Sequence, residues 1–407
     1  MKLNTKYKKY SKLINDIINN SLSSILQISI TQLIILPLIS KNAGEHEFGK
    51  ILTIVAIINF CSVVFGNSLN NTRVILNKEI GENELGNYNH ILIKNLIYSV
   101  IIISISLYII NQNIINSILI ILYSCMNIVR TYSYYEYRVK LQFRKILISN
   151  IYLSIGYLIG LGLFLIIKKV WIVSFLFGEI ISFIFLLKNN SLFVEKVVKT
   201  KMYDRIDALN IQFKISAFVT NIINYLDRIM IYPLIGAENV SVLYISSVFS
   251  KNAAIVFTPL ANVLLSHLSQ ISKQKAKKYF KLSVIISLIS TISVLCISMV
   301  ITPIFIRILY KNMYEKAIKL VLYTNLISSI NIGNSIIKPF IIRVSNMKKF
   351  NIINIIYLAI YTIFTVFGVI KYGLIGFCIG AIVANIINYI NNILFGYYSI
   401  KDNIIRD

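Results

Sequence analysis

The chain has 407 residues, of which 57% are hydrophobic and 14% charged, and its mean hydropathy is +0.73. Soluble domains are nearer half apolar and a quarter charged, so this composition excludes a cytosolic enzyme, a secreted disulfide domain and a disordered chain. A soluble fold cannot bury this much apolar surface, and lipid must therefore be the solvent for much of it.

The charge of the chain is strongly positive, with 41 Lys and Arg against 16 Asp and Glu, giving +25. In a membrane protein, Lys and Arg collect in cytoplasmic loops and hold the topology. This explains the charge better than nucleic-acid binding, so we expect no nucleic-acid partner. The cysteines and histidines show no metal-ligand spacing, and the sequence has no phosphate-binding glycine loop. We therefore expect no metal, no other cofactor and no ATP-driven step within this chain.

The apolar runs are continuous and about twenty residues long, as transmembrane helices require and barrel strands do not. Residues 2–12 carry five lysines, and the run after them is too long for a signal peptide, which predicts a retained first helix. The pattern predicts about twelve spans, at 21–40, 51–70, 91–110, 114–131, 148–167, 170–187, 211–235, 242–266, 282–306, 318–341, 350–370 and 374–396.

The distribution of loop charges predicts that both termini lie in the cytoplasm, because the inner segments of this arrangement hold most of the Lys and Arg. The fifth outer loop, which contains Arg307 and Lys311, goes against the rule. None of the predicted outer loops is long enough for a catalytic domain, which argues against a membrane polymerase. We therefore expect a protein that is not an enzyme.

Two proline-containing segments, Ile35-Leu36-Pro37-Leu38-Ile39-Ser40 and Ile231-Tyr232-Pro233-Leu234-Ile235-Gly236, lie about half a chain apart. Each is followed at the same spacing by an aromatic residue, Phe48 or Tyr244. This indicates an internal duplication with a boundary at 200/201, residues 188–210 being the linker. The predicted fold is an all-α polytopic membrane protein of about twelve helices. Its two six-helix halves, 1–200 and 201–407, form a parallel repeat around a central cavity.

Polar residues inside apolar spans are costly and are therefore functional candidates. Lys214, Asn221, Asn224, Asp227 and Arg228 recur at helical spacing in the seventh predicted span. They form either the wall of a substrate cavity or a brace between helices, and the sequence leaves both open.

Further polar candidates lie in other spans. Gln27 and Thr31 form a stripe in the first span, which the repeat aligns with the seventh. Lys251 lies in the middle of the eighth span, too far from either end to reach the headgroups, and we expect it to face a wet cavity. Glu179 is an acid in the middle of the sixth span. Glu179 either couples transport to an ion or forms a structural pair with a Lys or Arg. Asp227 is a second candidate for ion coupling.

Other polar and small residues have simpler explanations. Arg73, Arg130 and Lys338 lie near predicted cytoplasmic helix ends, where the positive-inside bias accounts for them. Gly373, Gly376 and Gly380 predict close helix packing.

The segment Leu226-Asp227-Arg228-Ile229-Met230-Ile231-Tyr232-Pro233-Leu234-Ile235-Gly236, the following Tyr244 and the stretch Phe257-Thr258-Pro259-Leu260 resemble the multidrug/oligosaccharidyl-lipid/polysaccharide (MOP) exporter superfamily. Within it they resemble the polysaccharide-biosynthesis branch of O-antigen flippases (Wzx type). The first span lacks charge, unlike that of the drug-exporter and peptidoglycan-precursor branches.

The resemblance implies a transporter that moves a polyprenyl-pyrophosphate-linked oligosaccharide, such as an O-antigen or capsule unit, across the bacterial cytoplasmic membrane by alternating access. It implies membrane lipids as surroundings and glycosyltransferases or a polymerase of the same pathway as partners. Arg228, Lys251 and Lys214 would face the pyrophosphate. The alternative is a cation-coupled multidrug or small-molecule exporter of the same fold, with Asp227 or Glu179 as the coupling acid.

Overall fold

The computed structural model describes residues 15, 18–19, 21–77, 79–81, 84–168, 170–191, 195–268, 273–344 and 347–406. For 253–268, 273–279, 342–344, 347–348 and 400–406 it describes the backbone only. The lysines of residues 2–12 and the side chains of Phe257–Leu260 therefore lie outside the described residues.

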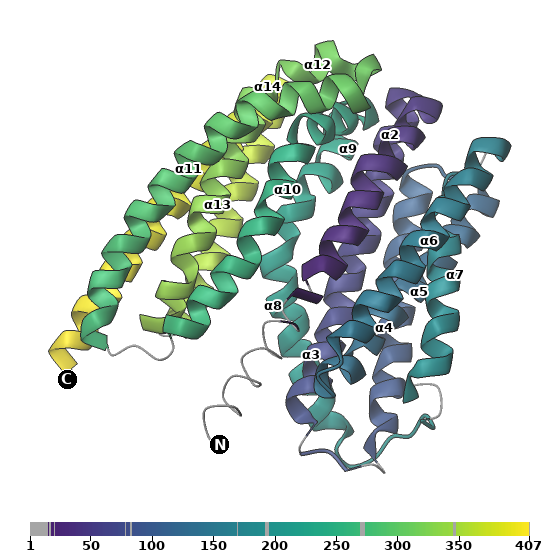
Figure 1. The fold of residues 1–407 in the computed structure, drawn as a ribbon, viewed down its shortest axis with the longest axis horizontal. Helices are drawn as coiled ribbons and strands as arrows, with labels where there is room; N and C mark the ends of the chain where they lie inside the picture. Colours follow the sequence, from purple (N-terminus) through teal and green to yellow (C-terminus); the bar gives the residue numbers. More distant parts are fainter. Residues whose placement is uncertain are drawn as a thin grey trace. The chain divides into compact units, whose positions relative to one another are not determined.

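The described structure consists of helices joined by short connections (Figure 1). In chain order they are η1 (Ile30–Ile35), α2 (Leu36–Cys61), η2 (Ser62–Asn67), α3 (Ser68–Leu76), α4 (Gly86–Ile109), α5 (Ile114–Val139), α6 (Phe143–Ile167), α7 (Val173–Asn189), α8 (Tyr203–Ile229), α9 (Ile231–Ile235), α10 (Ala237–Leu268), α11 (Lys273–Leu309), η5 (Lys311–Met313), α12 (Tyr314–Ile318), α13 (Val321–Val344) and α14 (Met347–Arg406).

Every predicted span falls on helical segments, although 211–235 crosses the break between α8 and α9 and 318–341 that between α12 and α13. The all-α membrane fold is confirmed. By length and apolar composition alone, 6 described helices could cross a membrane, or 7 if the bent pair Lys311–Ile318 and Val321–Ile341 counts as one span. This count is lower than the prediction partly because neighbouring predicted spans join. Residues Ser21–Leu76 form one helical stretch with Gly44 at φ 76°, and α14 contains two predicted spans on either side of Gly373 at φ 59°. Helix α7 has only 17 residues.

The structure divides into two compact units, which we describe separately. Unit 1 comprises residues 1–42 and 50–225, and unit 2 comprises 43–49 and 226–407. This division describes packing, whereas the predicted halves 1–200 and 201–407 rest on the repeat and stay a prediction.

Unit 1 is held together by helices that approach closely through small residues. A Cβ on Gly156 would lie 2.6 Å from Cα of Gly178, and one on Gly160 would lie 2.4 Å from the carbonyl oxygen of Val173. Helices α6 and α7 thus pack backbone to backbone, as small residues allow in lipid. The opposite faces carry exposed isoleucines such as Ile159 and Ile166, as a lipid-facing surface requires.

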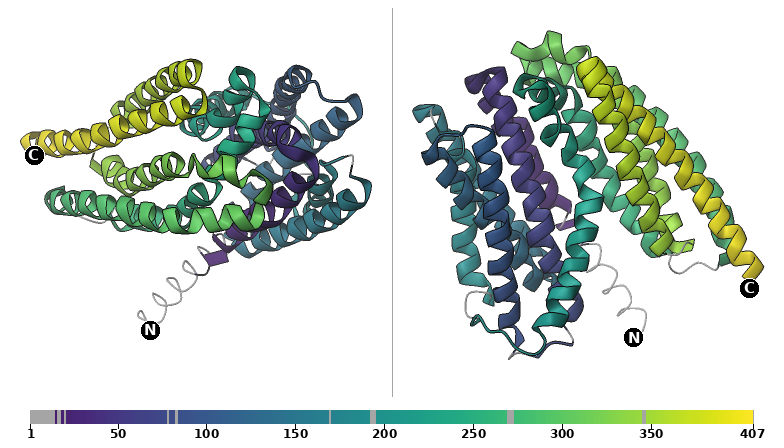
Figure 2. Two further views of the ribbon diagram at one scale, coloured as in Figure 1. Left: turned by 90° about the horizontal axis from the view of Figure 1, so that it is seen from above. Right: turned by 180° about the vertical axis from the view of Figure 1, so that it is seen from behind.

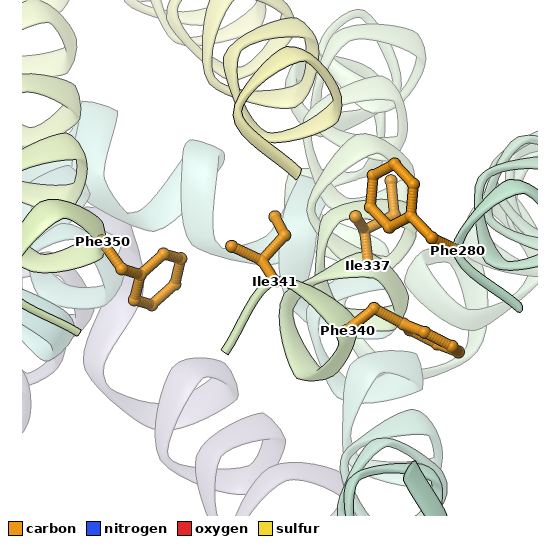
Figure 3. Close-up of a cluster of buried hydrophobic side chains, with 5 residues drawn as sticks. All are labelled: Phe280, Ile337, Phe340, Ile341 and Phe350. Atoms are coloured by element: carbon orange, nitrogen blue, oxygen red, sulfur yellow. The ribbon is translucent and has the colours of Figure 1, made fainter. Parts of the chain in front are cut away.

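Unit 2 is organised around α13, which packs against α10, α11 and α14. Helices α11, α13 and α14 run side by side in both further views (Figure 2). A buried apolar cluster joins these three helices, and Figure 3 shows Ile341 between Phe350 and Ile337. Its members are Phe280, Ile337, Phe340, Ile341 and Phe350.

Glycines allow α14 to fold back on itself within unit 2. A Cβ on Gly376 would lie 2.0 Å from the carbonyl oxygen of Gly368, and one on Gly380 would lie 2.4 Å from that of Phe364. The predicted close packing at these two positions is confirmed. Gly373 has a different role, because its positive φ makes the bend itself.

A short segment from early in the chain, residues 43–49, belongs to unit 2. The Phe48 ring is fully buried and lies 6.1 Å from both the Tyr244 and the Tyr310 ring. Ser241 donates a 2.6 Å hydrogen bond to the carbonyl oxygen of Glu45. Although residues 43–49 lie within the stretch Ser21–Leu76, their packing partners come from much later in the sequence.

Candidate functional site

The candidate site in unit 2 is an ion pair between α8 and α10, two helices that the sequence predicts to span the membrane. Asp227 lies near the end of α8 and Lys251 in the middle of α10, and the Lys251 ammonium donates a hydrogen bond to the Asp227 carboxylate. The Asp227 side chain is 5% exposed, whereas that of Lys251 is 38% exposed. The carboxylate is therefore buried and the ammonium remains accessible.

Arg228 adds a second cation to this carboxylate. Its Nε lies 3.5 Å from Oδ1 of Asp227, and its side chain is 15% exposed. Its guanidinium also lies over the Tyr244 ring, 5.4 Å from the centroid, a geometry that attracts a cation to the ring face. The adjacent charges Asp227 and Arg228 thus interact with each other as well as with α10.

Helix α14 completes the surroundings of the ion pair. Tyr361 is close enough to Asp227, and Cys378 to Lys251, for electrostatic interaction. Tyr361 in turn lies edge-on to Phe377, with ring centroids 6.5 Å apart. Both Tyr361 and Cys378 are buried, so α14 places a buried phenol and a buried thiol near the ion pair.

The three charged side chains carry a net positive charge, because two cations share one carboxylate. In a membrane-spanning region such a charge is expensive unless an anion or water compensates it. An arginine next to a lysine can bind phosphate or carboxylate oxygens through several charge-assisted hydrogen bonds. Chemically, the arrangement can therefore attract and release an anion.

Lys214, which the sequence groups with these residues, belongs to unit 1. Its ammonium lies 5.7 Å from the Phe65 ring centroid and 5.9 Å from that of Tyr98. Within the described part of the chain, no carboxylate forms an ion pair with it. Lys214 is thus a half-buried cation held beside aromatic rings, a second place where an anion can be attracted.

The remaining polar candidates also belong to unit 1, and the structure does not group them around a common ligand. Asn221 is half-buried and donates to the carbonyl oxygen of Ala217 at 2.9 Å, while Asn224 is exposed. Thr31 donates to the carbonyl oxygen of Gln27 at 2.8 Å, within the turn that leads into η1. Their role in a cavity stays a prediction.

Glu179 of α7 is the acceptor of a buried network in unit 1. Arg130 of α5 donates to it from Nε at 2.8 Å and from Nη2 at 3.0 Å, and Asn127 donates at 2.9 Å. The Arg130 and Glu179 side chains are 6% and 0% exposed. Because both carboxylate oxygens are occupied by donors, this geometry resembles a structural brace more than an exchangeable ion site.

Arg73 forms a second buried ion pair, with Glu195 beyond α7. It donates to the two carboxylate oxygens at 2.9 Å and 2.5 Å and to the Tyr132 hydroxyl at 2.6 Å. Its guanidinium also lies 3.7 Å from the Tyr135 ring centroid. The positive-inside explanation of Arg73 and Arg130 stays a prediction, and each of them is in addition buried with a carboxylate from a distant part of the sequence.

The α14 residues near the ion pair could not be identified from the sequence. Tyr361 and Cys378 lie in apolar runs, where a phenol and a thiol look like ordinary core residues. The repeat places Phe48 and Tyr244 at equivalent positions in the two halves. It does not predict that the two rings contact each other in unit 2. In the part of the chain that the structure describes, no group of His, Cys, Asp and Glu could hold a metal ion.

Comparison with known proteins gives no match to a protein-family model and none to a curated protein sequence. Solved structures do match. The chain is similar to lipid II flippase MurJ in an inward closed conformation, with 19% identity and a TM-score of 0.67 over 95% of this chain and 87% of that one.

Two further structures come from transporters of one superfamily. An inward-facing multidrug resistance MATE transporter of the MOP superfamily has 12% identity and a TM-score of 0.64, covering 94% of this chain and 95% of that one. A MOP superfamily transporter from Pyrococcus furiosus has 13% identity and a TM-score of 0.60, covering 95% of each chain. The chain is therefore a multi-pass, all-helical membrane protein with the fold of MOP superfamily transporters.

Proposed function

We propose that the chain is a flippase for a polyprenyl-pyrophosphate-linked oligosaccharide, an O-antigen, capsule or similar glycan unit, and that it works by alternating access. The observation that carries this proposal is the excess of cations at Asp227, Lys251 and Arg228. The likeness to a lipid II flippase adds support at the level of fold.

The charge balance favours an anionic cargo over a cationic one. A pyrophosphate group offers several anionic oxygens, and Lys251 and Arg228 offer donors of the matching charge. The accessible Lys251 ammonium makes the first contact, and the more buried Arg228 follows. Asp227 holds both cations in place before cargo arrives, and the phosphate oxygens then compete with its carboxylate for them.

The second candidate is a cation-coupled exporter of small molecules, with Asp227 as the coupling acid. The likeness to multidrug resistance MATE transporters and the burial of this carboxylate favour it. Asp227→Asn separates the two candidates. An exporter that depends on the carboxylate loses drug resistance completely. The flippase keeps its cations and loses only their positioning, so glycan export falls in part.

We place the chain in the bacterial cytoplasmic membrane with both termini in the cytoplasm, as the loop charges predict. Glycosyltransferases or a polymerase of the same pathway are its proposed partners, since they make and use the lipid-linked unit. Transport of this kind needs neither a cofactor nor nucleic acid, and we propose no enzymatic activity.

The test begins with deletion of the gene and analysis of surface polysaccharide and of polyprenyl-linked intermediates. We expect surface glycan to disappear while complete lipid-linked units accumulate facing the cytoplasm. Intact glycan with new sensitivity to drugs would favour the exporter. Units exposed outside but not joined to each other would point to a polymerase.

Complementation with variants then tests the site itself. Lys251→Ala and Arg228→Ala each remove a charge-assisted hydrogen bond of about 1.5–3 kcal/mol, which weakens anion binding about tenfold to hundredfold. We expect both variants to insert normally and to fail in restoring glycan. The matched control is Lys371→Ala, which removes an exposed lysine beside Phe367 in the same unit and should restore glycan fully. Full restoration by all three would overturn the cationic-site idea.

A further inference from the structure

A stripe of polar side chains runs along α13, and none of them belongs to the ion pair of the proposed site. Asn331, Asn334, Ser335 and Lys338 recur at spacings of three and four residues and therefore share one face of the helix. Asn331 is exposed, Ser335 and Lys338 are half-buried, and Asn334 is buried. Polar residues on a membrane-spanning helix are kept where they meet water, a partner or a ligand.

The buried end of the stripe contains unused hydrogen-bonding atoms. Asn392 of α14 donates from Nδ2 to Oδ1 of Asn334 at 3.0 Å and to Oδ1 of Asn388 at 3.4 Å. Nδ2 of Asn334 and Oδ1 of Asn392 are buried and have no hydrogen-bond partner in the described part of the chain. Because a buried polar atom without a partner destabilises the fold, these atoms indicate a missing partner.

Lys338 lies one helical turn beyond Asn334, on the same face. Among the residues that the structure describes, none forms a hydrogen bond or ion pair with its ammonium. Its neighbours Ile337, Phe340 and Ile341 belong to the apolar cluster of unit 2 and offer it no acceptor (Figure 3). A half-buried ammonium in such surroundings needs a counter-ion.

The sequence of unit 2 cannot easily supply that counter-ion. Between Glu238 and Asp402 the only acidic residue is Glu315. Glu315 lies on α12, which precedes the start of α13, whereas Lys338 lies near the end of α13. Helices α10, α11 and α14 pack against α13; α11 and α14 carry no acidic residue before Asp402, and the acidic residue of α10, Glu238, lies at its start. No acidic side chain that the structure describes in unit 2 pairs with Lys338, which leaves room for an anion from outside the chain.

We propose that Lys338 and Asn334 form a binding site for the phosphate group of an amphiphilic lipid. The ammonium pairs with a phosphate oxygen, and the unused Nδ2 of Asn334 donates to the same group. The hydroxyl of Ser335 and the amide of Asn331 lie along the stripe for the hydroxyls of the attached headgroup. The lipid is either the transported pyrophosphate-linked unit, in which case this inference rests on the proposed function, or a membrane phospholipid.

The test measures lipid binding to the purified full-length protein by native mass spectrometry. The probes are a long-chain polyprenyl pyrophosphate, phosphatidylglycerol and the uncharged polyprenol. We expect Lys338→Met to weaken binding of a phosphate-bearing probe about tenfold to hundredfold. Lys371→Met, which removes an exposed lysine from α14 of the same unit, should leave binding unchanged.

A second variant supplies the missing charge from within the chain. Ser335→Asp places a carboxylate three residues before Lys338, where it can pair with the ammonium on the helix surface. We expect this variant to be as thermally stable as the wild type and yet to bind phosphate lipids as weakly as Lys338→Met. This result cannot arise from misfolding.

The outcomes separate the two sources of phosphate. Loss of polyprenyl pyrophosphate binding in both variants supports a cargo site, and loss of phosphatidylglycerol alone supports a phospholipid site and overturns the cargo form. Unchanged binding of both lipids overturns the proposal. If Lys251→Ala loses cargo binding and Lys338→Met does not, the proposed function survives without this site. If the wild-type protein neither binds the pyrophosphate nor restores glycan, the proposed function fails, and the phosphatidylglycerol measurement alone decides on the site.

Discussion

The buried ion pair of Arg130 and Glu179 allows a sharp test of whether Glu179 braces unit 1 or takes part in transport. The single substitutions are Glu179→Leu and Arg130→Met, and the double variant combines them. Each single change leaves an uncompensated charge or an unsatisfied donor in a region where both side chains are almost fully buried. Breaking a buried pair in this way costs about 3–5 kcal/mol.

The double variant removes both charges and fills the site with apolar side chains. Replacement of a whole buried pair is often neutral or stabilising. Here the side-chain amide of Asn127 loses its acceptor, which costs about 1–3 kcal/mol, whereas the Tyr134 hydroxyl keeps Asn150 as its acceptor at 2.9 Å. We therefore expect the double variant to be less destabilised than either single variant.

The assay uses the single tryptophan of the chain, Trp171, which lies in unit 1 just before α7. Its ring lies 6.1 Å from that of Phe175, so its fluorescence reports the packing of the helix that carries Glu179. Unfolding is followed by titrating the purified protein with a denaturing detergent. Lys140→Met is the control, since its ammonium is paired with Glu136 but 54% exposed, and we expect a change below about 1 kcal/mol.

Two results would refute this reasoning. If the two single substitutions add without coupling, the pair does not act as a unit. If the double variant folds stably but no longer restores glycan in the deletion strain, Glu179 acts in transport, and its interpretation as a brace is wrong.

Three further predictions concern packing. Gly380→Leu should prevent stable folding, because a Cβ there would lie 2.4 Å from the Phe364 carbonyl oxygen. The control is Gly162→Ala, whose Cβ meets nothing within 4 Å and should cost little stability. The two variants are compared by their yield in detergent and by their melting temperature. Phe48→Ala should cost about 3–5 kcal/mol, the usual cost of truncating a buried aromatic side chain; a melting curve close to that of the wild type would contradict its place in unit 2. Arg73→Gln should release the chain around Glu195, which limited proteolysis would detect as a new cleavage between α7 and α8.

The positions of the helices could be predicted from the sequence because lipid enforces long apolar runs. Every predicted span lies on helical segments, and the Asp227 and Lys251 candidates turn out to contact each other. The contact itself could not be predicted, since it depends on how α8 and α10 align. The partners of Arg73 and Arg130 were missed for the same reason, as Glu195 and Glu179 lie far along the chain. Nothing in the sequence distinguishes such arginines from those that anchor a helix end.

The segment of residues 43–49 has a consequence for biosynthesis. It emerges from the ribosome among the first residues, but Tyr244 and Tyr310, which cover Phe48, are made much later. Residues 43–49 therefore cannot reach all of their packing partners until the chain has been made as far as Tyr310. A fragment that begins at Leu226 lacks residues 43–49, and so does one that begins at residue 201, so neither contains the whole of unit 2.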